Sequence, residues 1–200
     1  MKLPDRQILE TLKFDLHTGL LPVIAQHAFT GEVLMLAYAS REAIDRTIES
    51  GQLWFYSRSR AQLWRKGATS GNTLELVELA VDCDGDTLLA RVLPAGPACH
   101  TGARNCFGTA PTLTELACTI EQRATTAGPA SYTARLLADE NLRLKKLGEE
   151  AVELVLACAK VDRDRVAEEA ADLIYHLLVA CQAAGVALPD VLRVLEARRT

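Results

Sequence analysis

The sequence predicts two domains, a strand-rich α+β domain followed by an all-α domain. In the first half, short runs of leucine, valine and aromatic residues alternate with Gly, Pro, Asn and Asp, which is typical of strands and turns. From Leu113 onward, apolar residues recur with helical spacing. The segment 108–112 between them is small and polar and contains Pro111, as linkers often do. We therefore expect domains at 1–110 and 113–200.

The individual elements follow from local signals. Strands are expected at 20–28, 32–39, 53–57, 73–83 and 87–93. A helix is expected over 41–50, because Ser40 can cap it and Glu42 precedes Arg46 by one helical turn. Asp84-Gly85 predicts a tight hairpin between the last two strands. Helices are expected at 113–124, 132–160, 163–185 and 189–198, with breaks at Gly128-Pro129 and Gly185.

The composition limits the class of partner. The chain is 49% hydrophobic and 24% charged, which indicates a folded globular protein. A net charge of -4 disfavours non-specific nucleic-acid binding, so any phosphate-bearing partner should be small. The start of the chain lacks a secretory signal, and the apolar stretch 173–187 is too short to cross a membrane. We therefore expect a cytoplasmic protein with reduced thiols and no membrane partner.

Three of the six cysteines lie in polar, turn-rich surroundings, where metal-binding thiolates are expected. These are Cys83, Cys99 and Cys106. Three thiolates leave one tetrahedral position open, which indicates a catalytic zinc and a hydrolytic reaction. The other three, Cys118, Cys158 and Cys181, lie in Ala/Leu-rich helical segments, where we expect buried packing residues.

Carboxylates and cations surround these cysteines in the sequence. Asp82, Asp84 and Asp86 flank Cys83 and could bind Mg²⁺, although a solvated turn has the same composition. Upstream, cations, hydroxyls and small residues could hold phosphate, and an indole could hold a purine. The alternative is an exposed basic hairpin. The candidate substrate-binding residues are Ser57, Arg58, Ser59, Arg60, Trp64, Lys66, Ser70, Gly71 and Asn72.

Read together, residues 12–108 resemble phosphoribosyl-AMP cyclohydrolase of histidine biosynthesis. The resemblance runs through GEVLMLAY (31–38), FYSRSR (55–60), LWRKG (63–67), TSGN (69–72), DCDGD (82–86), and the segments 96–102 and 106–107. It implies hydrolytic opening of the adenine ring between N1 and C6. It also implies Mg²⁺ on the three aspartates, and Zn²⁺ on Cys83 of one subunit with Cys99 and Cys106 of its dimer mate. A zinc held by thiolates is a weak acid, so a base would help; His100 is the candidate, or else a fourth zinc ligand.

Acidic residues also line two of the expected helices. Glu149, Glu150 and Glu153 share one stripe, with Leu147, Ala151, Leu154, Val155 and Cys158 expected on the opposite, apolar side. On the next helix, Glu169 and Asp172 lie close together with His176 between them. Facing acid stripes on antiparallel helices would hold Mg²⁺ for a phosphate substrate. Two ordinary solvated helix faces, with Lys146 paired to Glu150, remain the alternative.

The acidic pattern resembles the all-α, MazG-like nucleoside triphosphate pyrophosphohydrolases. Across residues 113–200, the runs SYT (131–133), KKLGEEA (145–151) and EEAADL (168–173) are similar to phosphoribosyl-ATP pyrophosphohydrolase. The resemblance implies that Mg²⁺ binds to Glu150, Glu153, Glu169 and Asp172, that Glu149 assists catalysis, and that Lys145 or Lys146 binds phosphate.

Both resemblances in one chain, in this order, predict a bifunctional enzyme for the second and third steps of histidine biosynthesis. The helical domain would act first and the strand-rich domain second. Two alternatives are a nucleotide pyrophosphatase with a degenerate first domain, and a non-enzymatic metal-binding module. The complete Cys/Asp set argues against the first, and turnover would exclude the second.

Overall fold

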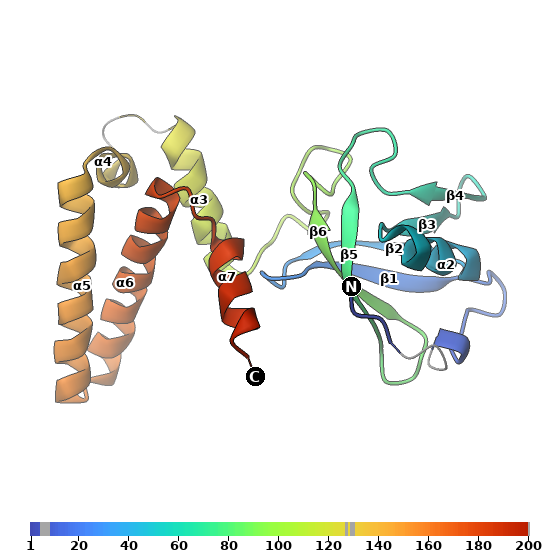
Figure 1. The fold of residues 1–200 in the computed structure, drawn as a ribbon, viewed down its shortest axis with the longest axis horizontal. Helices are drawn as coiled ribbons and strands as arrows, with labels where there is room; N and C mark the ends of the chain where they lie inside the picture. Colours follow the sequence, from blue (N-terminus) through green and yellow to red (C-terminus); the bar gives the residue numbers. More distant parts are fainter. Residues whose placement is uncertain (5–8, 127, 129–130, 200) are drawn as a thin grey trace. The chain divides into compact units, whose positions relative to one another are not determined.

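The computed structural model describes residues 1–4, 9–126, 128 and 131–199. The chain divides into two compact units, Met1–Ala110 and Pro111–Thr200 (Figure 1). The first unit contains all the named strands and the second contains only helices. The predicted fold class, strand-rich α+β followed by all-α, is therefore confirmed.

A four-stranded sheet forms the centre of the first unit, with strand order β2-β1-β6-β5. The outer pairs are antiparallel, whereas β1 and β6 run parallel. Alternate residues of β1, such as Leu21, Val23 and Ala25, are buried, as expected for a strand with one face on the core. The sheet strands are β1 (Leu21–His27), β2 (Val33–Ala39), β5 (Leu74–Val81) and β6 (Leu88–Pro94).

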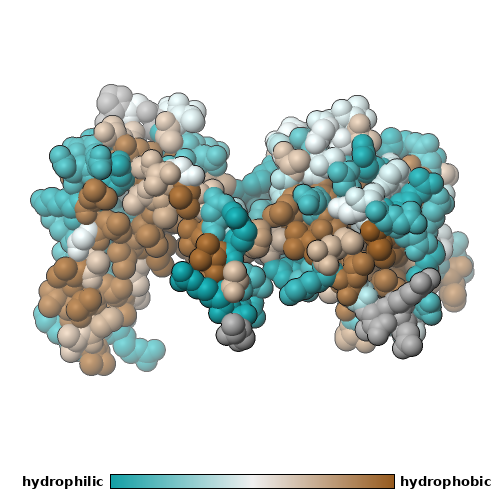
Figure 2. Space-filling view, in the orientation of Figure 1, coloured by the Kyte–Doolittle hydropathy of each residue, from teal (hydrophilic) through white to brown (hydrophobic). Residues whose placement is uncertain are grey.

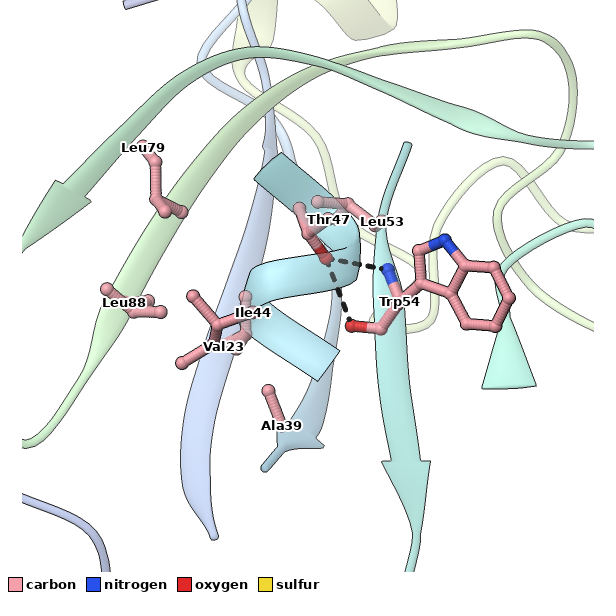
Figure 3. Close-up of a pocket in the computed structure, with 8 residues that line it drawn as sticks. All are labelled: Val23, Ala39, Ile44, Thr47, Leu53, Trp54, Leu79 and Leu88. Atoms are coloured by element: carbon pink, nitrogen blue, oxygen red, sulfur yellow. Dashed lines mark hydrogen bonds between the residues drawn. The ribbon is translucent and has the colours of Figure 1, made fainter. Parts of the chain in front are cut away.

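Helix α2 (Arg41–Ser50) packs on this sheet (Figure 3). As predicted, Ser40 caps it: the Ser40 side chain accepts from the Ala43 N–H, and Gly51 ends the helix with a left-handed φ of 68°. Buried Thr47 joins the helix to the next strand, because its hydroxyl accepts from the Trp54 N–H at 2.9 Å. Ile44 and Thr47 of α2 share a small pocket with Val23, Leu79 and Leu88 of the sheet.

Two features of the first unit differ from the sequence predictions. Strands β5 and β6 form the expected hairpin, but residues 82–87 connect them, so the turn is longer than Asp84-Gly85 alone. In addition, β3 (Trp54–Ser57) pairs with a strand that was not predicted, β4 (Gln62–Arg65). This pairing packs the Phe55 ring against the Trp64 ring at a tilt of 39°, with ring centroids 5.1 Å apart. Packing between strands of this kind leaves little trace in a four-residue pattern.

In its described part, the second unit consists of five helices around a small core. Buried Ile120, Leu136, Leu178, Val179 and Leu188 form that core. The helices are α3 (Thr112–Thr126), α4 (Tyr132–Ala138), α5 (Glu140–Lys160), α6 (Arg163–Ala183) and α7 (Leu188–Ala197).

The prediction of one helix over 132–160 is wrong. The chain leaves the helical conformation at Asp139, whose φ of -109° and ψ of 104° end α4. The Asp139 side chain accepts from the Leu142 N–H at 3.0 Å and so caps α5. Arg143 donates to the carbonyls of Leu136 and Leu137 at 3.0 and 2.9 Å, which satisfies the C-terminal end of α4.

Parts of the helical surface are more apolar than expected. Cys158 is exposed, which contradicts its predicted burial, and Cys118 and Cys181 are only half-buried. Val155, expected on the apolar side of the same helix as Cys158, is exposed too. They are exposed because α5 turns its other face toward α6. Brown, apolar surface covers part of these two helices in Figure 2. Within the described residues, no single helix could span a membrane by length and hydropathy, and one bent pair, α6 with α7, meets these criteria jointly.

Candidate active sites

Two of the three predicted zinc ligands lie together in the first unit. The thiols of Cys99 and Cys106 lie close enough for each to shift the pKa of the other. The Thr101 hydroxyl donates to Cys99 Sγ at 3.1 Å and, as the largest cause, lowers the pKa of the Cys99 thiol. Burial and then the neighbouring Cys99 raise the pKa of Cys106. His100 lies beside the pair, with Nδ1 3.8 Å from Cys99 Sγ. The pair therefore has the composition of part of a soft-metal site.

The third predicted ligand, Cys83, does not join the pair within one chain. It is exposed on the loop between β5 and β6. In the part of the chain that the structure describes, no cluster of three ligating atoms within 4.8 Å of one another contains Cys83. A single chain thus brings together two of the three thiols.

The aspartate loop is organised around one carboxylate. Carboxylate oxygens of Asp82, Asp84 and Asp86 lie within 4.8 Å of one another, all on exposed residues. Asp82 Oδ1 accepts from the backbone N–H groups of Gly85, Asp86 and Thr87 at 3.0, 3.1 and 3.1 Å. Desolvation raises the pKa of Asp82, but the hydrogen bonds from Thr87, Asp84 and the rest of the loop outweigh it, so the net shift is downward. The loop thus holds three carboxylates close together, as a hard cation requires.

The predicted Ser/Arg segment forms the turn after β3. Ser57 Oγ accepts from the backbone N–H and from Nε of Arg60, both at 3.3 Å. The Arg58 guanidinium lies over the Tyr38 ring, 3.9 Å from its centroid. Ser59 is exposed beside Ser57, with the two hydroxyls 3.4 Å apart. The exposed hydroxyls and guanidinium groups could receive an anion.

The predicted loop after β4 contains one buried cation. Lys66 is buried, and its Nζ donates to the Asn72 carbonyl at 3.4 Å. Gly67 has φ +80°, and an added Cβ would lie 2.4 Å from the Asn72 carbonyl carbon. Ser70 and Gly71 remain exposed at the tip of the loop. Trp64, in contrast, packs against the core through Phe55, so its substrate-binding role stays a prediction.

The second unit gathers three of the four predicted magnesium ligands. Carboxylate oxygens of Glu150, Glu169 and Asp172 lie within 4.8 Å of one another, between α5 and α6. Glu150 is 8% exposed and Glu169 only 3%. Glu153 stands outside this trio, but it lines a pocket of about 310 Å³ together with Glu169. Asp172 is exposed, but two buried carboxylates this close together are costly without cations and suit a divalent metal.

Cations surround the carboxylates. Glu149 pairs with Lys146 at 2.9 Å and with Lys145 at 3.3 Å, and these hydrogen bonds, Lys146 first, lower the pKa of the Glu149 carboxyl. Lys146 Nζ also lies 3.7 Å from Glu150 Oε1. Arg165, which the sequence analysis did not single out, pairs with buried Glu169. Its position four residues before Glu169 was the available signal.

A buried histidine also lies in this region, and the sequence analysis assigned it no role. His176 is buried, with Nε2 3.8 Å from Glu150 Oε1 and the Tyr132 and Tyr175 rings edge-on to its own. Desolvation lowers the pKa of His176, so the imidazole is neutral near pH 7. Its Nδ1 has no hydrogen-bond partner among the described residues. The position between Glu169 and Asp172 was predicted; the contact with Glu150 was not.

Comparison with known proteins agrees with this division. Residues 35–108 match the family model of phosphoribosyl-AMP cyclohydrolase, and residues 113–199 match that of phosphoribosyl-ATP pyrophosphohydrolase. The chain is 47% identical over 185 residues to the histidine biosynthesis bifunctional protein HisIE of Escherichia coli (strain K12), covering 90% of this chain and 91% of that protein. The HisIE protein of Thermus thermophilus is 45% identical over 197 residues, covering 94% and 92%.

The two family matches fall on the two structural units, in the order that the sequence predicts. The two relatives are matched over 91% and 92% of their own length. The prediction of a bifunctional hydrolase is confirmed, and the two alternatives, a pyrophosphatase with a degenerate first domain and a non-enzymatic metal module, are not supported. The chain belongs to the family of bifunctional histidine-biosynthesis enzymes, with a phosphoribosyl-AMP cyclohydrolase domain followed by a phosphoribosyl-ATP pyrophosphohydrolase domain.

Proposed function

We propose that the two hydrolytic activities use two separate metal sites, one in each unit. The observation that carries this proposal is that each unit has its own cluster of ligating side chains: Cys99 with Cys106 in the first, and Glu150, Glu169 and Asp172 in the second. The helical domain hydrolyses phosphoribosyl-ATP to phosphoribosyl-AMP and pyrophosphate. The strand-rich domain then opens the adenine ring between N1 and C6.

In the cyclohydrolase domain, Cys99 and Cys106 would hold Zn²⁺ together with Cys83 of a second copy of the chain. The lowered pKa of Cys99 favours the thiolate, the form that binds the metal. When bound, zinc would supply Lewis acidity, which lowers the pKa of a water ligand toward about 7, though less far when three thiolates hold the metal. His100, beside Cys99, is placed to take up the proton of the attacking water, or to serve as a fourth ligand. A homodimer is therefore part of the proposal.

The same domain would bind substrate on its charged loops. Asp82, Asp84 and Asp86 offer hard oxygen ligands for Mg²⁺, and their mutual repulsion favours a cation at this position. The Ser57–Arg60 turn and the loop of Lys66, Ser70, Gly71 and Asn72 supply hydroxyls, backbone N–H groups and positive charge for phosphates. Trp64 could contribute only the part of its ring that the core leaves exposed.

In the helical domain, Glu150, Glu169 and Asp172 would hold Mg²⁺, with Glu153 as a fourth ligand from the pocket wall. Bound magnesium supplies charge neutralisation for the triphosphate. Lys145 and Lys146 lie next to these carboxylates through Glu149 and could bind the phosphates. Glu149, kept ionised by the two lysines, could orient or deprotonate the attacking water.

We also propose a cytoplasmic location, because thiolate ligands require a reducing compartment. Cys83, Cys99 and Cys106 carry free thiols. The substrates would be small nucleotides, in agreement with the net charge of -4, which disfavours nucleic acid.

Reciprocal variants test the two-site proposal. Glu150→Gln should stop pyrophosphate release from phosphoribosyl-ATP yet leave the opening of supplied phosphoribosyl-AMP intact. Cys99→Ser should do the reverse and should lose zinc, because a hydroxyl is a poor ligand for a soft metal. Circular dichroism would establish that both variants are folded. Loss of both activities in either folded variant would contradict two independent sites.

A further inference from the structure

A buried carboxylate lies behind the loop that carries the cysteine pair. Glu32, between β1 and β2, is 2% exposed. Its Oε1 accepts from Nε of Arg104 at 2.9 Å and from Nδ2 of Asn105. A buried charge is unfavourable unless it is paired and hydrogen-bonded, and both of these donors come from the two residues directly before Cys106.

Asn105 transmits this anchoring to the backbone around Cys106. The Asn105 side chain is buried, and its Oδ1 accepts from the N–H groups of Phe107 and Gly108, both at 2.8 Å. Its Nδ2 also donates to the Thr109 carbonyl at 2.9 Å. One amide group therefore fixes the turn that follows the cysteine.

Backbone contacts connect the same loop to the sheet and to Cys99. The Cys106 N–H donates to the carbonyl of Leu34 in β2 at 2.8 Å, two residues from Glu32. The Cys99 N–H donates to the Ala103 carbonyl at 3.1 Å, and the Ala98 N–H to the Arg104 carbonyl at 3.0 Å. Glu32 thus holds the one segment on which the relative position of the two thiols depends.

We propose that Glu32 is a positioning residue for the cysteine pair: through Arg104 and Asn105 it keeps the Cys106 thiol against the Cys99 thiol in the geometry that a zinc ion requires. This inference rests on the proposed zinc site. Glu32 does not touch the reacting groups, because it is buried and its oxygen is occupied by the two side-chain donors. Its effect on the reaction is exerted through ligand geometry.

The test compares Glu32→Gln with Glu78→Gln. Glu78 pairs with Arg91 at 2.7 Å in the same domain, on β5 and β6, so its variant also loses an arginine–carboxylate pair but leaves the cysteine loop untouched. Zinc affinity is measured by competition with a chromophoric chelator. A trivalent monoarsenical, which binds two thiols only when they are adjacent, probes the metal-free protein in parallel.

Glu32→Gln should weaken zinc binding by about 10- to 100-fold, the usual effect of losing a group that orients metal ligands. Arsenical binding should weaken as well, whereas Glu78→Gln should match the wild type in both measurements. Unchanged binding in Glu32→Gln, or an equal loss in both variants, would overturn the inference. If Glu32→Gln does not fold, Arg104→Gln carries the test, since the Arg104 side chain is 38% exposed and its loss should move both readouts in the same direction.

The two proposals can fail separately. A wild-type protein that binds no zinc would refute the zinc site. The arsenical measurement would still show whether Glu32 holds the two thiols together.

Discussion

The proposed sharing of zinc between subunits makes a quantitative prediction. In one chain Cys99 and Cys106 are close neighbours that shift each other's pKa, whereas Cys83 lies on the 82–87 loop and joins no cluster of ligating atoms among the described residues. If Cys83 completes the site of a second copy, Cys83→Ser and Cys99→Ser homodimers each lack one thiolate in every site. Both variants should therefore be inactive as cyclohydrolases when tested alone.

Mixed dimers should recover activity. In a mixed dimer one site contains both substitutions and the other contains three intact thiolates. Random reassociation makes half of the dimers mixed, and each has one good site of two, so about a quarter of the wild-type ring-opening activity should return. If each zinc were held within one chain, every site would remain defective and nothing would return.

The assay has an internal control. The two variants are unfolded and refolded together, and ring opening of phosphoribosyl-AMP is measured. Pyrophosphate release by the helical domain measures how much enzyme has refolded, because neither substitution lies in that domain. Two distinguishable affinity tags report the fraction of mixed dimers. Recovery near zero, with mixed dimers shown to form and pyrophosphate release normal, would refute the shared site.

Three further predictions concern single positions. Asp84→Asn should keep its zinc but lose Mg²⁺-dependent ring opening, because it removes a hard oxygen ligand; zinc loss by elemental analysis would contradict this. Gly51→Ala should lower the free energy of unfolding by about 1 kcal/mol, because alanine is strained at the left-handed φ of this position. Gly67→Ala should lower it by clearly more, because the added Cβ would also lie 2.4 Å from the Asn72 backbone. Equal losses of unfolding free energy for the two variants, measured by chemical denaturation, would refute the effect of this contact. Desolvation lowers the pKa of His27 below its ordinary value of 6.5. The unfolded state therefore binds more protons than the folded state, and the stability of the protein should fall as the pH drops below about 6.5. His27→Asn keeps an acceptor for the Phe29 and Thr30 N–H groups, and it should make the melting temperature depend less on pH.

The elements that the sequence predicted correctly are those with local causes. Helix α2 begins at a capping serine and ends at a glycine, and both signals lie within the element itself. The end of α4 also had a local signal, the capping carboxylate of Asp139, but the apolar periodicity continues across it. What distinguishes a break from a continuous helix there is Arg143, whose side chain reaches back to two carbonyls of the preceding helix.

The residues of the candidate sites also differ in whether a local signal in the sequence identifies them. Cys83, Cys99 and Cys106 could be singled out because their own neighbours in the sequence are polar. Glu32 could not, because its ion-pair partner Arg104 is 72 residues away and a lone glutamate at the start of an apolar run resembles any strand boundary. The separation of Cys83 from the other two thiols within one chain could be expected only from the resemblance to a family, because the spacing of the cysteines along the sequence does not indicate it.

Helix α5 shows why periodicity alone did not identify the proposed magnesium ligands. A helical wheel gives the angle of each residue but not the face that meets the neighbouring helix, and the face toward α6 contains Glu150 together with half-buried Leu147 and Leu154. The apolar side chain of Val155 points outward instead. An amphipathic interpretation would place Glu150 in solvent, where it would need no partner. Its burial beside Glu169 and Asp172 is unfavourable for an ordinary helix pair, since the nearby Lys146 is shared with Glu149 and Arg165 is shared with Glu168. The proposed divalent cation would remove that difficulty, so the chemistry of the acidic motif, rather than its periodicity, would account for the burial of Glu150 and Glu169.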